Sequence, residues 1–190
     1  MTDEAFKLDA EGWLGGVRRV ESPNFDERPG DEAPSLIVVH AISLPPNEFG
    51  GDGIERLFTN ALDPDAHPYY REIHGLRVSA HFLVRRDGEV LQFVACGRRA
   101  WHAGLSAWRG RQRCNDFSIG IELEGCDSLP FEPVQYAVLA RLVRSLRRTH
   151  ALPDMAGHSD IAPGRKTDPG PFFDWDLCRR LVAGAGDETG

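Results

Sequence analysis

The feature that most constrains the fold is a short aliphatic run that ends in a histidine. Leu36-Ile37-Val38-Val39 is followed by His40, and the whole stretch from Ser35 to Ile42 is apolar and rich in β-branched residues. Turn-forming residues lie on both sides of it. A run of this length and composition predicts a fully buried strand. We therefore expect residues 35–42 to form a central strand of a sheet.

Other segments also read as strands. Val78 to Arg86 and Glu89 to Ala95 flank the dipeptide Asp87-Gly88. Asp-Gly between two strand-like runs is a strong signal for a β-hairpin. Phe117 to Leu123 has the same character as the first run and predicts a further strand.

Two segments have helical spacing. Pro133 to His150 carries apolar residues three and four apart, begins with proline and ends in basic residues. Asp174 is expected to cap a final helix that Gly184 ends. Between the first strand and the hairpin, Phe49 to Gly75 predicts a long loop with a short helix at Ile54–Leu62.

Strands and helices are mixed along the chain without strict alternation. This pattern predicts a single α/β (α+β) domain, with a mixed central β-sheet flanked by helices. The length of 190 residues suits one domain. We expect residues 1–34 to form an irregular N-terminal lead-in, residues 35–183 the domain and residues 184–190 a C-terminal tail.

Composition excludes several classes of partner. With 22 basic and 29 acidic residues the net charge is −7, so the chain has no overall attraction for nucleic acid. Its apolar runs are too short to span a bilayer, and the first residues lack the pattern of a secretory signal. We expect a cytoplasmic protein with no membrane partner. Nothing in the sequence pattern indicates oligomerisation, so we also expect a monomer. The four cysteines are expected to be free thiols rather than a metal site.

Three side chains could hold a metal ion. His40 ends the predicted central strand, where ligand sites tend to cluster. His158 follows the long helix, and Asp168 lies ten residues later in a loop rich in Gly and Pro. Two histidines and a carboxylate can hold Zn²⁺ and leave a fourth position open for water. The alternatives are a rim histidine and a loop-capping aspartate, and spacing alone does not separate these interpretations.

Further candidates lie between these ligands. Alternation along Ile119 to Leu123 puts Glu122 on the face opposite the isoleucines, so it is either a solvated residue or a functional carboxylate. Trp101 and His102 follow a strand and are joined by Trp108 and Arg109. Aromatic residues interleaved with His and Arg favour a groove for a sugar or peptide, although a tryptophan can also belong to the core.

Taken together, these motifs resemble a known family, the zinc N-acetylmuramyl-L-alanine amidases. The resemblance covers nearly all of residues 13–183 and is most specific from Gly157 to Gly170. It is similar in particular to the cytoplasmic branch that acts on 1,6-anhydro-N-acetylmuramyl-L-alanine. The motifs that carry it are, in order, His40 with Ser43-Leu44-Pro45-Pro46, Ser79-Ala80-His81-Phe82, Trp101-His102-Ala103-Gly104, Ser118-Ile119-Gly120-Ile121-Glu122, and Gly157-His158-Ser159-Asp160-Ile161-Ala162-Pro163-Gly164-Arg165-Lys166-Thr167-Asp168-Pro169-Gly170.

The resemblance implies a mixed sheet flanked by helices, shared with peptidoglycan-recognition proteins, and one Zn²⁺ per chain. The implied reaction is hydrolysis of the amide bond between anhydro-N-acetylmuramic acid and L-alanine of the stem peptide, so the partner is an anhydromuropeptide. In the family this reaction serves cell-wall recycling and influences β-lactamase expression. The residues it implies are the zinc ligands His40, His158 and Asp168, the catalytic Glu122 and Lys166, and the substrate-binding Arg77, Trp101, His102 and Arg113.

The chain departs from the family at two positions. Ala41 stands where the branch often has a larger or polar residue, and Ala80 stands where some members carry tyrosine. The second departure supports Glu122 as the acid–base group, because no tyrosine is present there. Four alternatives stay open: a general amidase of cell-wall fragments, an exported amidase, a peptidoglycan-binding module without catalysis, and a zinc hydrolase for an unrelated amide or ester.

Overall fold

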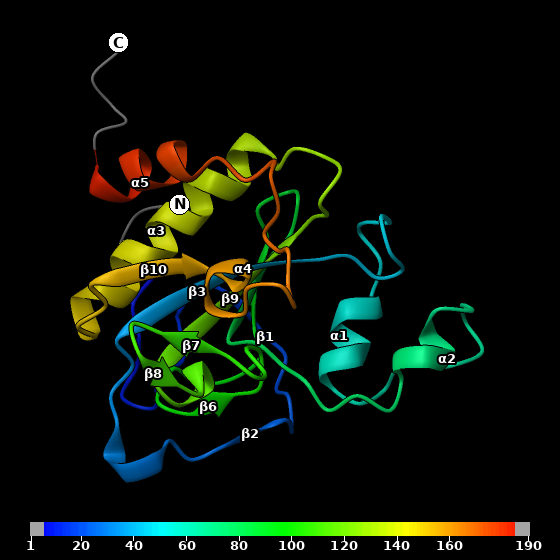
Figure 1. Ribbon diagram of the computed structural model, residues 1–190, viewed down its shortest axis with the longest axis horizontal. Helices are drawn as coiled ribbons and strands as arrows, with labels where there is room; N and C mark the ends of the chain where they lie inside the picture. The colour runs from blue at the N-terminus through cyan, green and yellow to red at the C-terminus, as the bar shows by residue number, and fades with distance from the viewer. Residues whose placement is uncertain (1–5, 185–190) are drawn as a thin grey trace.

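The structure, a computed structural model, describes residues 6–184. Its centre is a six-stranded sheet in the order β1-β5-β4-β9-β3-β10 (Figure 1). All neighbouring strands are parallel except β4 and β5, so the sheet is mixed, as the sequence predicts. In chain order the strands are β1 (Arg18–Arg19), β3 (Leu36–Ile42), β4 (Phe82–Val84), β5 (Val90–Gln92), β9 (Ser118–Glu124) and β10 (Asp154–Gly157).

The two longest strands, β3 and β9, are neighbours at the centre of the sheet. Both were predicted, and β9 is buried along its whole length. In their parallel register His40 lies opposite Glu122. Because side chains alternate between the faces of a strand, both point to the same face of the sheet. Strand register therefore brings a candidate ligand and a candidate catalytic residue together.

Two helices cover the other face of the sheet. They are α3 (Pro133–Thr149) and α5 (Trp175–Ala183), which lie side by side in Figure 1. Leu139 and Leu142 of α3 are fully buried in the same core cluster as Ile119. Both helices were predicted. At the start of α5, Asp174 accepts a hydrogen bond from the backbone N–H of Leu177, at 2.8 Å.

Two short helices, α1 (Gly53–Phe58) and α2 (Tyr70–Ile73), lie in the segment between β3 and β4, on the right of Figure 1. The predicted helix at 54–62 is confirmed as α1, although it begins one residue earlier and ends at Phe58, and α2 was not predicted. Leu57 and Phe58 bury their side chains against residues of β4 and β5. The stretch between β3 and β4 is therefore packed onto the sheet.

The predicted hairpin is confirmed, with strands shorter than expected. β4 and β5 pair in antiparallel fashion around the turn at Asp87-Gly88, where Gly88 has a φ of 88°. The remaining strands form two small sheets outside the main one. These are β2 (Phe25–Asp26) with β6 (Arg99–Ala100), and β7 (Ala107–Trp108) with β8 (Arg111–Gln112).

Three short helical turns complete the described elements. They are η1 (Pro29–Asp31), η2 (Cys114–Asp116) and α4 (His158–Ile161). All four cysteines are free thiols, as expected. Among residues 6–184, none of the helices has the length and apolar character that a membrane crossing requires.

The N-terminal segment shares the core of the domain. Phe6 and Leu14 are buried in the cluster that α3 also enters, and the Ser145 hydroxyl donates to the Phe6 carbonyl at 2.5 Å. The division at residue 34 stays a prediction, and the segment before it is less irregular than expected, since β1 joins the main sheet. Of the predicted tail, only Gly184 lies within the described residues.

Candidate metal centre and active site

Three side chains from distant parts of the chain converge at the end of β3. His40 Nδ1 lies 2.9 Å from His158 Nδ1, and each of these nitrogens lies 3.1 Å from Asp168 Oδ2. His40 comes from β3, His158 opens α4, and Asp168 belongs to the loop that follows α4. The structure thus brings together the three ligands that the sequence predicted.

The loop that carries Asp168 is fixed by its backbone. The N–H of Ser159 donates to the carbonyl of Asp168 at 2.9 Å, which ties the loop to the first turn of α4. Gly157 permits this approach, because a Cβ there would lie 2.9 Å from the ring of Pro169. The Gly- and Pro-rich composition of this segment therefore allows Asp168 to return beside His158.

The donor set suits a divalent metal such as zinc. Burial lowers the pKa of His40 to about 4, so its imidazole is neutral at neutral pH. Two imidazole nitrogens and one carboxylate oxygen form a ligand set that leaves a coordination position open for water. At separations of 2.9–3.1 Å the three atoms are close enough to converge on a single cation. The three residues therefore fit the metal that the sequence pattern implies.

Glu122 lies beside this trio in a buried position. Its side chain is only 8% exposed, so the alternative of a solvated outer face is wrong. Its Oε2 atom has no hydrogen-bond partner among the described residues. Burial raises the pKa of Glu122 well above its ordinary value, the charge of Asp168 adds to this, and Lys166 opposes it. A carboxyl group poised in this way suits proton transfer.

These residues face one cleft with a volume of about 350 Å³. Lys166 is exposed at its edge, and Trp101 and His102 lie in its wall. A further part of the wall is apolar, and its residues were not among the predicted site residues. It comes from the segment between β3 and β4 and comprises Leu44, Pro46, Leu57, Phe58, Tyr69, Ile73, Leu76 and Val78.

The predicted substrate-binding residues divide into two groups. Trp101 lines the cleft and donates from Nε1 to Asp26 Oδ1 at 3.2 Å. His102 also lines it, with its ring against that of His40. Arg77 and Arg113 do not line the cleft, and Arg113 instead pairs with Asp116 at 3.1 Å. Contact of all four residues with substrate stays a prediction.

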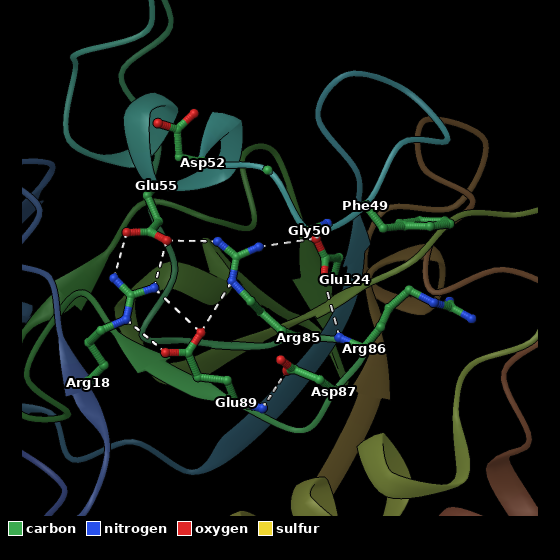
Figure 2. A pocket seen from close by; sticks show the side chains of 11 residues that line it. Arg18, Phe49, Gly50, Asp52, Glu55, Arg85, Arg86, Asp87, Glu89 and Glu124 are labelled. Carbon is green, nitrogen blue, oxygen red and sulfur yellow. Dashed lines mark hydrogen bonds and ion pairs between the residues drawn. The ribbon is translucent and has the colours of Figure 1, made fainter.

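A second cavity, of about 450 Å³, lies next to α1 and contains a network of ion pairs (Figure 2). Figure 2 shows Arg85 lying between three glutamates, with Glu55 at 2.7 Å and Glu124 at 3.1 Å. Glu124 also accepts a hydrogen bond from the backbone N–H of Gly50, at 2.6 Å. Glu124 is two residues beyond Glu122 on the same face of β9. The network therefore ties the loop after β3 to the strand that carries Glu122.

Replacing Arg85 with alanine is expected to lower the free energy of unfolding by about 3–5 kcal/mol, because it leaves the buried Glu124 without its counterion. Arg18 is the matched control, since it also pairs with Glu55 but its side chain is 43% exposed. Its replacement should cost at most about 1 kcal/mol. Urea unfolding of both variants measures the difference, and equal small losses would refute a buried anchoring role for Arg85.

Comparison with known proteins places the chain in a family. The family described as N-acetylmuramoyl-L-alanine amidase matches residues 30–171. The 1,6-anhydro-N-acetylmuramyl-L-alanine amidase AmpD of Salmonella typhimurium is 60% identical over 178 residues, which cover 93% of this chain and 95% of that protein. The match thus includes all the predicted site residues and most of the segment before residue 34.

Solved structures agree with the sequence comparison. A crystal structure of a selenomethionine derivative of AmpD matches with a TM-score of 0.90 at 59% identity, covering 92% of this chain and 98% of that one. The amidase AmiD of Escherichia coli, solved with the substrate anhydro-N-acetylmuramic acid-L-Ala-D-gamma-Glu-L-Lys, matches with a TM-score of 0.57 at 30% identity. That match covers 93% of this chain and 65% of AmiD. The predicted mixed α/β fold is confirmed, and the chain belongs to the N-acetylmuramoyl-L-alanine amidase family.

Proposed function

We propose that this chain is a zinc-dependent amidase of anhydromuropeptides. It hydrolyses the amide bond between 1,6-anhydro-N-acetylmuramic acid and L-alanine of the stem peptide, as a monomer in cytoplasmic peptidoglycan recycling. One observation carries the proposal: the trio His40, His158 and Asp168 lies in the same cleft as the buried, unpartnered carboxyl oxygen of Glu122. The name of the relative AmpD supports the choice of substrate.

The metal ligands and Glu122 have different roles in the proposed hydrolysis. His40, His158 and Asp168 would hold the zinc ion, which would supply Lewis acidity to make water nucleophilic at neutral pH and to polarise the amide carbonyl. Glu122 accepts the proton of the attacking water and passes a proton to the leaving amine of L-alanine. Its buried position fits this role, because burial raises the pKa of Glu122 and makes its carboxylate a stronger base than an exposed one.

Lys166 supplies positive charge at the edge of the cleft. Its ammonium faces the oxyanion that forms when water adds to the carbonyl. The apolar part of the wall and the indole of Trp101 offer surfaces for the sugar ring and the lactyl methyl group. Lys166 is not one of the three proposed zinc ligands. Its charge should therefore affect turnover and not zinc binding.

Replacing Lys166 with alanine is expected to lower kcat by about 10²–10³-fold, the usual cost of losing one donor to an oxyanion. Zinc content, measured by atomic emission, should stay at one ion per chain. Lys7, which lies outside the cleft, is the control, and its alanine variant should keep normal turnover. Loss of zinc from the Lys166 variant with normal substrate binding would contradict the assignment.

A mass-spectrometric cleavage assay tests the function. The protein is mixed with anhydro-N-acetylmuramyl tripeptide or with the reducing-end muramyl tripeptide, each with and without a zinc chelator. We expect chelator-sensitive release of tripeptide from the anhydro form alone. Equal cleavage of both would favour a general cell-wall amidase. No release by a zinc-loaded protein would favour a binding module or an unrelated hydrolase.

A further inference from the structure

The Nε2 atoms of the two proposed histidine ligands, His40 and His158, both contact one short segment of the chain. His40 Nε2 lies 2.9 Å from His102 Nδ1, and His158 Nε2 lies 3.1 Å from the carbonyl oxygen of Ala103. Residues 102 and 103 are adjacent. The orientation of both ligands therefore depends on where this dipeptide lies.

A chain of hydrogen bonds decides which nitrogen of His40 carries the proton. The Ser118 hydroxyl donates to the Cys114 carbonyl at 2.5 Å, so its oxygen accepts from His102 Nε2, at 3.2 Å. With its proton on Nε2, neutral His102 can only accept at Nδ1. His40 must then donate from Nε2, which leaves a lone pair on the Nδ1 atom that faces the metal centre.

The same logic applies more simply to His158. A backbone carbonyl can only accept, so His158 donates from Nε2 to Ala103, and its Nδ1 atom keeps a lone pair. Arg165 donates to the same carbonyl at 2.7 Å, which holds the acceptor in place. Both imidazoles thus present a free lone pair to the position between them.

The dipeptide is held by Asn115. Its side-chain oxygen accepts hydrogen bonds from the backbone N–H groups of His102, at 3.1 Å, and Ala103, at 2.7 Å. Asn115 is buried, with 7% of its surface exposed. Gly120 leaves room for the ring of His102, because a Cβ at that position would lie 2.5 Å from the ring. The side-chain oxygen of Asn115 therefore fixes the positions of His102 and Ala103, which contact the ligands His40 and His158.

We propose that Asn115 is a positioning residue of the metal centre, which fixes the proton positions and orientations of His40 and His158 through His102 and Ala103. This inference rests on the proposed function only in taking the trio as a metal site. Asn115 is not among the residues that line the cleft. Groups that orient metal-bound histidines typically change metal affinity by about 10–100-fold when they are removed.

Zinc affinity, measured by competition with a chromophoric chelator, tests the proposal. Asn115→Ala should weaken zinc binding by about 10–100-fold. Asn115→Asp keeps an oxygen that can accept both N–H groups, so it should restore most of that affinity. Gln92→Ala is the matched control, because Gln92 is also buried and its side-chain oxygen accepts a backbone N–H group, that of Leu14, outside the cleft. Equal zinc affinity in Asn115→Ala and the wild type would overturn the proposal.

Proton positions give a second readout that does not require Asn115→Ala to fold. Nitrogen-15 NMR of the zinc-loaded wild type at neutral pH should show the imidazole proton on Nε2 in His40, His102 and His158. A proton on Nδ1 of His40 or His158 would overturn the proposal. Neither measurement involves substrate. If zinc affinity and proton positions are as expected but the protein does not cleave anhydromuropeptides, the proposed function alone is refuted. If the protein cleaves them and Asn115→Ala binds zinc as tightly as the wild type, this inference alone is refuted.

Discussion

Replacing Glu122 with glutamine is expected to lower kcat by about 10²–10⁴-fold, the range that general acid–base catalysis contributes. Glutamine has nearly the same shape as glutamate but cannot accept a proton from water or return one to the leaving amine. The side chain is not one of the three converging ligands, so zinc should be retained. Initial rates of tripeptide release, measured with zinc content on the same samples, separate these two effects.

Glu89 provides the control for this prediction. It is a partly exposed carboxylate of the second cavity, and Glu89→Gln should leave turnover within about twofold of the wild type. If Glu122→Gln kept more than about a tenth of wild-type turnover with zinc in place, Glu122 would not be the acid–base group.

Replacing Asp168 with alanine is expected to empty the metal site and abolish activity. The variant leaves the two histidines without the one anionic ligand that helps to balance the charge of the cation. We expect zinc affinity to fall by more than about 100-fold, which exceeds the usual effect of losing an outer partner. Metal content after dialysis, measured by atomic emission, reports the loss directly.

Asp127 tests whether the effect of Asp168 is specific. It is exposed and accepts a hydrogen bond from the hydroxyl of Thr167, the residue before Asp168. Asp127→Asn should therefore keep its zinc. Full zinc occupancy in Asp168→Ala would show that the carboxylate is not a ligand, and the proposed centre would have to be abandoned.

The elements that sequence predicts well have strong local signals. The aliphatic run at Leu36–Ile42 and the 3.6-residue spacing in Pro133–Thr149 each specify one kind of element. The turn at Asp87-Gly88 likewise fixed the hairpin, because only a few residue types suit its backbone. The ligand set came from a resemblance across the whole chain, since spacing alone did not separate it from its alternatives.

Other features have no local signal. β10 is four residues long and owes its existence to pairing with β3, so tertiary contacts define it. The apolar wall of the cleft comes from a segment that reads as a loop. Asn115 lies in a short 3-10 turn, and its importance depends on a dipeptide twelve residues away in sequence. These features follow from how distant segments meet, which residue patterns do not encode.

The most direct test of the account is a crystal structure of the zinc-loaded protein with anomalous diffraction data at the zinc absorption edge. The account predicts one anomalous peak per chain, coordinated by His40 Nδ1, His158 Nδ1 and Asp168 Oδ2. Glu122 should lie in the same cleft without binding the metal. A peak held by other residues, or by the Nε2 atoms of the two histidines, would contradict it.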